Sequence, residues 1–243
     1  MPADTRHDLS VVLPAYAEAE NLREFVPALT DVLSTMALDF EILVIDTQKP
    51  KDDTAEVCRL TGTHRVPRRG GDEYGNAIRT GIEESTGSRI LIMDVDGSHH
   101  PEFVRELWVQ RNQADIIIAS RYTKGGSTDN PFLLVLLSQL LNTVFALILR
   151  MPVRDISNSF RLYHGDQLRR LELTSMHFDI QEEILARLLW TPGVAASVLE
   201  VPFHFRQRSH GSSKRNMAVF TVAFIMAMGR LWMLKRNLMR TRS

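Results

Sequence analysis

Two aspartates at the end of an apolar run are the residues of this sequence best suited to chemistry. Asp94 and Asp96 follow the run at 90–93 and are separated by one valine. In extended backbone, residues i and i+2 point to the same side, so both carboxylates are expected to converge on one small volume. Their hard oxygen atoms suit Mg²⁺ or Mn²⁺ carrying a phosphorylated substrate. A solvated turn is the alternative, because Asp and Gly are common in turns and Gly97 follows directly.

The elements that must position these carboxylates alternate along the first half of the chain. Buried strands are predicted at four short apolar runs, 9–13, 40–45, 89–93 and 115–119. Helices are predicted from apolar periodicity and start signals at 21–36, 54–60, 74–85 and 102–113. This alternation indicates an α/β fold with a mainly parallel sheet flanked by helices. Ligands of such sheets bind beyond the carboxyl ends of the strands, where Pro14, Asp46 and Asp94 lie.

Length and composition allow one large α/β domain or two smaller ones. The chain has 243 residues, of which 44% are hydrophobic and 24% are charged, as is ordinary for a globular protein. Its single cysteine, Cys58, excludes an internal disulfide and fits a reducing compartment. We expect no secretory signal, because residues 1–10 contain no apolar core.

The zero net charge conceals a marked asymmetry. After Glu200 the sequence contains Lys and Arg residues but no Asp or Glu. This tail therefore carries a charge of about +9, and the first 200 residues carry about −9. A basic end beside an acidic body suggests an anionic surface or ligand. We expect no nucleic acid partner.

Two apolar segments of 18 residues, 132–149 and 217–234, approach the minimum length that spans a bilayer. Polar pairs at spacing i,i+4, such as Ser138 with Asn142, give the first segment a narrow polar stripe, and basic clusters flank the second. Both are predicted to be amphipathic helices that lie on the cytoplasmic face of a membrane, peripheral rather than spanning. The alternative is that they are core helices or the interface of a homo-oligomer.

Further motifs follow one another in order along residues 9–216. They are VVLPAYAE at 11–18, ILVID at 42–46, GNAIRTG at 75–81, DVDGSHHPE at 94–102, SRY at 120–122, DISNSFR at 155–161 and RSHGSSK at 208–214. In this order they resemble the family-2 inverting glycosyltransferases of GT-A fold, especially the dolichol-phosphate mannose synthase-like group. The resemblance implies a GT-A (Rossmann-like) catalytic domain at 1–216, in which 132–149 is an acceptor-side helix. A basic, membrane-associating helix and tail at 217–243 would follow it.

On the donor side, the resemblance implies a site for a nucleotide-diphosphate sugar, a GDP- or UDP-hexose. The residues implied to hold its base and ribose are Pro14, Tyr16, Glu18, Asp46 and Asp94. The implied ligands of Mg²⁺ or Mn²⁺ are Asp94, Asp96 and Ser98. Arg208 and Lys214 would close on the pyrophosphate, and with Asp94 and Asp96 they are the predicted catalytic residues. No zinc site is expected at His99 and His100, because adjacent histidines project apart and no thiolate is near.

On the acceptor side, the resemblance implies transfer of a mannose- or glucose-type hexose to a dolichyl- or undecaprenyl-type polyprenyl phosphate. The implied acceptor-binding residues are Arg121, Ser138, Asp155, Ser157, Ser159 and Arg161. Arg121 would contact the phosphate, whereas Asp155 and Arg161 could instead pair with each other. The rival hypotheses are a hydroxyl acceptor, with Asp155 as the general base, and a catalytically weak binding or scaffold homologue. Glu182 and Glu183 are interpreted as surface charge.

Two departures from the family pattern bear on specificity. Asp46 is followed by residues 47–50, TQKP, where the family usually has an acidic residue, Gly and Ser. Leu134 stands where relatives commonly place an arginine. The first leaves GDP and UDP undecided. The second removes one contact to the acceptor phosphate, unless another residue supplies it.

Overall fold

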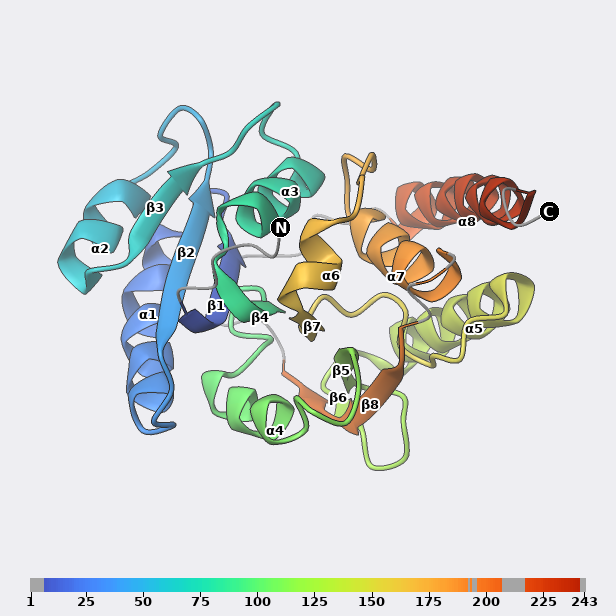
Figure 1. The fold of residues 1–243 in the computed structure, drawn as a ribbon, viewed down its shortest axis with the longest axis horizontal. Helices are drawn as coiled ribbons and strands as arrows, with labels where there is room; N and C mark the ends of the chain where they lie inside the picture. Colours follow the sequence, from blue (N-terminus) through green and yellow to red (C-terminus); the bar gives the residue numbers. More distant parts are fainter. Residues whose placement is uncertain (1–6, 192, 194–195, 207–216, 241–243) are drawn as a thin grey trace.

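The computed structural model describes residues 7–191, 193, 196–206 and 217–240. At its centre lies a seven-stranded sheet in the order β3-β2-β1-β4-β7-β5-β8, and β6 and β9 form a second, two-stranded sheet (Figure 1). The strands are β1 His7–Pro14, β2 Phe40–Asp46, β3 His64–Pro67, β4 Gly87–Ile92, β5 Ile116–Ser120, β6 Ser127–Thr128, β7 Arg161–His164, β8 Val198–Pro202 and β9 His204–Phe205. An α/β fold with a mainly parallel sheet is confirmed.

Helices connect most of these strands. They are α1 Ala19–Ser34, α2 Thr54–Thr61, α3 Tyr74–Glu84, the 3-10 turn η1 Pro101–Phe103, α4 Val104–Val109, α5 Phe132–Leu149, α6 Gly165–Arg169, α7 Ile180–Trp190 and α8 Met217–Arg240. The helix predicted at 102–113 is shorter than expected, because it begins as a 3-10 turn and ends at Val109. The helix expected at 217–234 instead continues to Arg240.

One strand runs against its neighbours. β7 lies between β4 and β5 and is antiparallel to both, with Arg161 opposite Ile92 on one side and Ile118 on the other. The segment that enters β7 therefore lies at the carboxyl ends of β4 and β5. The sequence did not predict this strand, because four residues are too few to give a clear period.

Alternate strand residues pack on opposite faces of the sheet, as the pleat requires. In β4, Leu91 packs in the core under α1, α2 and α4, whereas Ile90 and Ile92 pack in the core under α3, α5, α6 and α7. All three side chains are fully buried. Helices on both faces thus fix the sheet from two sides and hold its carboxyl edge in place.

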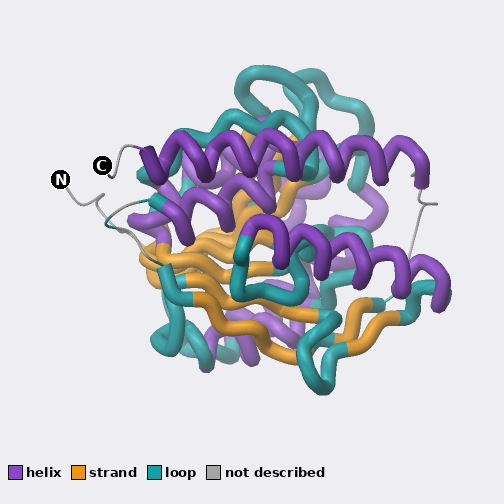
Figure 2. The backbone as a smooth tube through the Cα atoms, turned by 90° about the vertical axis from the view of Figure 1, so that its right-hand side faces the viewer, coloured by secondary structure: helices purple, strands orange, loops and turns teal. Residues whose placement is uncertain are grey.

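Three helices form a layer at one end of the molecule. Figure 2 shows α5, α7 and α8 side by side, and α8 contacts both of the others. Within the described residues, α5 is the one helix long and apolar enough to cross a membrane by length and composition, with 17% of that stretch buried. Its exposed apolar side chains include Phe132, Leu133, Leu136, Leu140, Leu147 and Ile148. At the carboxyl end of α5, Lys235 of α8 donates to the carbonyl of Leu149.

The interpretation of Glu182 and Glu183 as surface charge is wrong, because both side chains are buried. The Glu183 carboxylate accepts hydrogen bonds from the backbone of Thr174 and Ser175 and from the Arg187 guanidinium. Burial by itself would raise the pKa of Glu183, but these hydrogen bonds outweigh it and lower the pKa below its ordinary value of 4.5. Glu183 therefore ties the loop before α7 to that helix.

Glu183→Gln is expected to lower the free energy of unfolding at pH 7 by roughly 1–3 kcal/mol, because a charged acceptor of several hydrogen bonds is lost. Since the folded-state pKa is depressed, this stabilisation is present above the ordinary pKa of 4.5 and disappears as the pH falls through the folded value. Urea unfolding of both proteins from pH 7 to pH 3 should therefore show the difference shrinking below about pH 4.5. A difference that stays constant over this range would contradict the account.

Candidate active site

A cavity of about 260 Å³ opens at the carboxyl end of the sheet. Its lining residues are Pro14, Tyr16, Glu18, Arg68, Asp72, Tyr74, Asp94, Val95, Asp96 and Phe178. Five of these were predicted as site residues: Pro14, Tyr16, Glu18, Asp94 and Asp96. The ends of β1 and β4 thus bring the two separate motifs together, as expected for neighbouring parallel strands.

Both oxygens of the Asp94 carboxylate are held by hydroxyl groups. Ser159 donates to Oδ2 at 2.8 Å, and Tyr74 donates to Oδ1 at 3.3 Å. Burial and the nearby Asp94 charge raise the pKa of the Tyr74 phenol well above its ordinary value, so the hydroxyl keeps its proton. Tyr74 in turn accepts from Gln181 and stacks on Phe178, with ring centroids 4.2 Å apart. Each oxygen of Asp94 keeps a further lone pair for a ligand.

His99 holds the backbone of the same aspartate, Asp94. Its Nδ1 accepts the backbone N–H of Asp94 at 2.9 Å, and its Nε2 lies 3.2 Å from Oδ1 of Asn158. Because Nδ1 accepts, Nε2 carries the proton and donates to Asn158. Burial lowers the pKa of the imidazole, which is consistent with this neutral form, and the ring stacks on Phe160. His99 therefore joins the end of β4 to the segment that enters β7.

Asp96 is buried, and its Oδ1 accepts from both the backbone N–H and the hydroxyl of Ser98. Ser98 was predicted as a metal ligand. The structure instead places its hydroxyl, which is almost fully buried, against Asp96, where it orients that carboxylate. Within the described ranges no group of three or more His, Cys, Asp or Glu residues could hold a metal ion. The available donor set is therefore the pair Asp94 and Asp96.

On the nucleotide side, Asp46 is not positioned as the resemblance implied. Its carboxylate is buried and accepts from the Arg65 guanidinium at 2.8 Å and from the backbone N–H of Thr47 at 2.7 Å. It does not line the cavity. Two unpredicted residues, Arg68 and Asp72, do. Arg68 reaches the carbonyl of Ala15 and lies 5.8 Å from the Tyr16 ring centroid. Arg68 and Asp72 follow β3, a four-residue strand that the sequence pattern did not reveal.

Arg121 lies at the end of β5 in a nearly buried ion pair. Its Nε and Nη2 donate to the two oxygens of Asp155 at 2.8 and 2.7 Å, and Nη2 also donates to the Ser157 hydroxyl at 2.9 Å. Burial would lower the pKa of the guanidinium, but the Asp155 charge outweighs it and raises the pKa. The arginine is therefore charged at every physiological pH. Nη1 has no hydrogen-bond partner among the residues that the structure describes.

Three of the predicted acceptor-binding residues have other contacts. Arg161 is fully buried and donates to the carbonyls of Gln181 and Ile156, so it braces the protein interior and does not reach a ligand. Asp155 is also fully buried and holds Arg121. Ser159 holds Asp94. The alternative that Asp155 pairs with Arg161 is wrong, because Asp155 pairs with Arg121.

The predicted cationic loop, with Arg208 and Lys214, lies outside the described residues. The chain that leads to it can be followed to Arg206, whose backbone N–H lies 3.4 Å from the carbonyl oxygen of Ser98. Phe203 and Phe205, just before Arg206, contact the His99 ring. Arg206, the last described residue before the predicted cationic loop, therefore lies beside the loop that carries Asp96.

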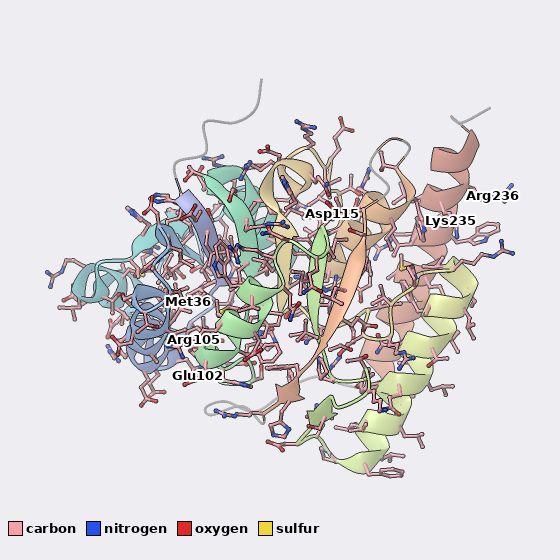
Figure 3. All side chains as sticks on the ribbon, turned by 60° about the horizontal axis from the view of Figure 1, so that its bottom comes forward. Met36, Glu102, Arg105, Asp115, Lys235 and Arg236 are labelled. Carbon is pink, nitrogen blue, oxygen red and sulfur yellow. The ribbon has the colours of Figure 1, made fainter. Side chains whose placement is uncertain are left out.

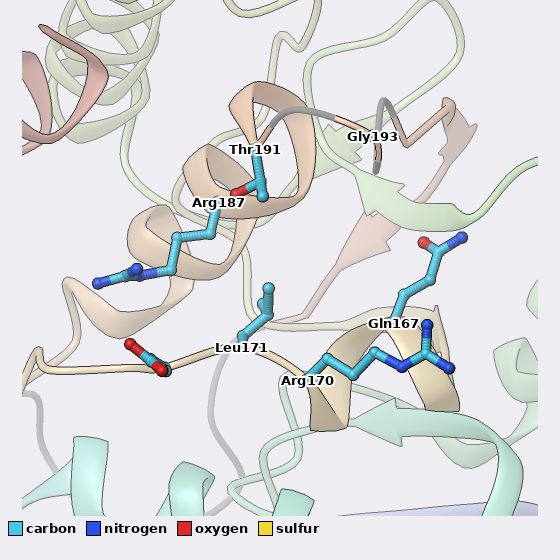
Figure 4. Close-up of a pocket in the computed structure, with 7 residues that line it drawn as sticks. Gln167, Arg170, Leu171, Arg187, Thr191 and Gly193 are labelled. Atoms are coloured by element: carbon cyan, nitrogen blue, oxygen red, sulfur yellow. The ribbon is translucent and has the colours of Figure 1, made fainter. Parts of the chain in front are cut away.

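A second, larger cavity of about 430 Å³ is lined by Gln167, Arg170, Leu171, Glu172, Arg187, Thr191 and Gly193 (Figure 4). Gln167 donates to Asp115, which directly precedes β5. This cavity therefore lies at the amino ends of the strands, away from Asp94, and it contains none of the predicted site residues.

Residues 10–171 match the family model described as glycosyl transferase family 2. The chain belongs to glycosyl transferase family 2. The protein is accordingly a glycosyltransferase, and the cavity at Asp94 and Asp96 is the part of the molecule in which the predicted donor-side motifs meet.

Curated relatives of this family 2 glycosyltransferase include the dolichol-phosphate mannosyltransferase of Pyrococcus furiosus, 32% identical over 213 residues. That match covers 85% of this chain but 58% of the relative, so the chain spans little more than half of the Pyrococcus protein. The polyprenol monophosphomannose synthase of Mycolicibacterium smegmatis is 31% identical, with 91% and 88% covered. The undecaprenyl-phosphate mannosyltransferase of Micrococcus luteus is 29% identical, with 88% and 90% covered.

Solved structures confirm the GT-A fold of this glycosyltransferase. The mannosyl-3-phosphoglycerate synthase from Rubrobacter xylanophilus matches with a TM-score of 0.73 at 16% identity, covering 96% of this chain and 76% of that one. The glucosyl-3-phosphoglycerate synthase from Mycobacterium tuberculosis, in complex with Mn²⁺, UDP and glucosyl-3-phosphoglycerate, matches with a TM-score of 0.66 at 16% identity, covering 92% and 80%.

Gly75→Ala is expected to displace Tyr74 and Phe178 from the cavity. A Cβ at Gly75 would lie 2.3 Å from the carbonyl oxygen of Ser175, and the Gly75 N–H donates to the carbonyl of Met176 at 2.7 Å. Relief of this clash should cost about 1–3 kcal/mol of unfolding free energy and weaken nucleotide-sugar binding measured by calorimetry.

Gly229→Ala in α8 is the matched control, because an added Cβ there meets nothing within 4 Å. Alanine is the better helix former by about 0.5–1 kcal/mol, so this variant should be as stable as the wild type or more so. If Gly75→Ala binds nucleotide-sugar as well as Gly229→Ala does, the proposed packing at Tyr74 is incorrect.

Proposed function

We propose that this glycosyltransferase moves a hexose, of the mannose or glucose type, from a nucleotide-diphosphate sugar to a polyprenyl phosphate at a membrane surface. One observation carries the proposal: the cavity brings Tyr16 and Glu18, which follow β1, together with Asp94 and Asp96, which follow β4. The names of the relatives agree, because all three are mannosyltransferases or mannose synthases of a polyprenyl carrier.

The donor would lie across the cavity, with its base near Tyr16 and its diphosphate near Asp94 and Asp96. A tyrosine that is half exposed at the rim offers a flat apolar face to a base, and Asp72 and Glu18 offer acceptors for ring N–H groups and ribose hydroxyls. Asp46 is paired with Arg65 and does not line the cavity, so we assign these acceptors to Glu18 and Asp72. This arrangement suits either a GDP- or a UDP-sugar.

The donor chemistry of the two carboxylates fits Mg²⁺ or Mn²⁺. Mg²⁺ usually keeps several waters and binds through one or two carboxylates plus substrate phosphates, so a third protein ligand is not required. When bound, such an ion would stabilise the charge of the departing nucleoside diphosphate. The protein's own share is orientation: Ser159 and Tyr74 hold Asp94, and Ser98 holds Asp96. The neighbour from Mycobacterium tuberculosis carries Mn²⁺ and UDP in its complex, which supports this choice.

The acceptor side favours a phosphate over a hydroxyl. A hydroxyl acceptor needs a base, and Asp155, the predicted one, is fully buried with both oxygens bonded to Arg121. A phosphate oxygen is already anionic near neutral pH and needs no base. Arg121 presents Nη1, which its partners in the described part of the chain leave unoccupied, and this group would bind the acceptor phosphate. Leu134 offers no such contact.

The outer face of α5 supports a membrane location. Its exposed leucine, phenylalanine and isoleucine side chains form an apolar surface next to the acceptor side of the site. Lys235 and Arg236 lie on α8 beside the carboxyl end of α5 (Figure 3). Apolar side chains flanked by cations are typical of helices that lie in the interface of an anionic membrane. We propose the cytoplasmic face, with α5 and α8 lying on the membrane.

Radiolabelled transfer tests this proposal. Wild-type protein given nucleotide-sugar, Mn²⁺ and polyprenyl phosphate in lipid vesicles is expected to form an organic-extractable product, with a preferred nucleotide among GDP- and UDP-sugars. Asp96→Ala should reduce that product by roughly 100-fold or more while the circular dichroism spectrum stays unchanged. EDTA should have the same effect on the wild type.

Two results would contradict the proposal. Label found only in water-soluble products would exclude the lipid phosphate and favour a hydroxyl acceptor. Full activity of Asp96→Ala would exclude the carboxylate pair from catalysis.

A further inference from the structure

Asn142 is the buried polar residue of an otherwise apolar and largely exposed helix. In α5 the buried residues are Asn142, Phe145 and Leu149. The two apolar residues pack in the core beneath α7 and α8, whereas Asn142 faces the segment that leads into β7. An amide placed in such a position costs free energy unless its hydrogen-bonding groups are paired. The contacts of Asn142 therefore indicate why this residue type stands there.

All the hydrogen-bonding capacity of the Asn142 amide is used. Oδ1 accepts the backbone N–H groups of Ile156 at 2.8 Å and of Ser157 at 3.1 Å. Nδ2 donates to the Ser138 carbonyl at 2.8 Å and to the Ser157 hydroxyl at 3.2 Å. Because backbone N–H groups can only donate, the oxygen must face them, which fixes the orientation of the amide. One side chain of α5 thus holds two consecutive residues of the loop.

The Ser157 hydroxyl lies between Asn142 and Arg121. It accepts from Nη2 of Arg121 at 2.9 Å and from Nδ2 of Asn142 at 3.2 Å. Asp155, in the same loop, also holds Arg121, since its carboxylate accepts three hydrogen bonds from the backbone and guanidinium of Arg121. The position of Arg121 therefore depends on this loop, which Asn142 holds at Ile156 and Ser157 and Glu200 holds at the N–H of Asp155.

The same loop also reaches the donor side. Asn158 donates to the Ala119 carbonyl and accepts from His99, which in turn accepts the N–H of Asp94. Four consecutive residues thus connect the exposed helix to Arg121 on one side and to Asp94 on the other. Among the residues that the structure describes, no other side chain of α5 hydrogen-bonds to this loop, so Asn142 is the polar link of the helix to the site.

We infer that Asn142 is a positioning residue that sets Arg121 and the loop at 155–158 in place for the acceptor, and so couples the docking of α5 to transfer. This inference rests on the proposed function. Asn142 would act through Arg121 and the loop, without touching the substrate itself. Its effect is expected on the acceptor side, since Asp94 is held by Ser159 and Tyr74, neither of which hydrogen-bonds to Asn142.

The experiment compares three substitutions in α5. Asn142→Ala removes all four hydrogen bonds and favours the helix. Phe145→Ala loosens the helix through an apolar contact and leaves the loop bonds intact. Thr143→Ala changes an exposed neighbour and serves as the inert control. For each we would measure the melting temperature, donor affinity, KM and kcat for polyprenyl phosphate, and hydrogen exchange of residues 155–158 by mass spectrometry.

Asn142→Ala is expected to lower kcat/KM for polyprenyl phosphate by about 10- to 100-fold, because misplacing a binding group by an ångström costs about that much. Donor affinity should stay within about twofold of the wild type, and exchange at 155–158 should accelerate. Phe145→Ala should lower the melting temperature without this selective loss. Thr143→Ala should match the wild type.

The inference is overturned if Asn142→Ala behaves like Thr143→Ala, or if its loss of activity falls equally on donor and acceptor and scales with melting temperature as for Phe145→Ala. Hydrogen exchange separates this result from a failure of the proposed function. If the wild type transfers nothing to polyprenyl phosphate, faster exchange at 155–158 in Asn142→Ala still supports the positioning role, and unchanged exchange refutes it. Asn142→Asp, which keeps the oxygen that faces the two N–H groups, should retain more of the protection.

Discussion

The active site depends on one strand that runs against its neighbours. β7 lies antiparallel between β4 and β5, so the segment that leads into it crosses the carboxyl edge of the sheet at the point where Asp94 and Arg121 emerge. That segment then supplies Asp155 to Arg121, Asn158 to His99 and Ser159 to Asp94. A fully parallel sheet would place a helix connection there instead. The topology thus brings one loop within reach of both halves of the reaction.

Buried charge explains why this loop is so fully hydrogen-bonded. Arg121 is nearly buried, and a buried guanidinium is costly unless its donors are satisfied. Asp155 and Ser157 satisfy Nε and Nη2. The Asp155 carboxylate also accepts the backbone N–H of Arg121, and Glu200 accepts the N–H of Asp155 at 2.9 Å. What remains for the proposed acceptor phosphate is Nη1 of the guanidinium. A preorganised cation of this kind loses little reorganisation energy when an anion arrives.

Much of the fold could be predicted because its signals are local. Apolar runs predicted the four strands β1, β2, β4 and β5, and apolar periodicity predicted the helices α1, α3 and α5. The order of the motifs led to the GT-A assignment. Short elements such as β3 and β7 could not be predicted, since four residues carry too little pattern. With β3 missing, Arg68 and Asp72 could not be placed in the cavity.

The sequence predicted which residues gather at the candidate site better than it predicted which atoms each of them contacts. Pro14, Tyr16, Glu18, Asp94 and Asp96 meet in one cavity as expected. Motif membership does not distinguish a residue that touches a ligand from one that holds such a residue. Ser98, Ser159, Asp155 and Arg161 all belong to the motifs, and each is buried against another side chain or a carbonyl. That distinction requires the three-dimensional arrangement.

In the proposed function, Asp94 and Asp96 form one site for a divalent ion and a nucleoside diphosphate. Electron paramagnetic resonance of Mn²⁺ tests it directly, because bound Mn²⁺ loses the sharp six-line signal of the free ion. Addition of GDP or UDP is expected to increase Mn²⁺ binding by the wild type, and Asp96→Asn should abolish that increase while remaining folded. The account is contradicted if the nucleoside diphosphate binds equally well with EDTA present, or if Asp96→Asn retains the coupled binding of Mn²⁺.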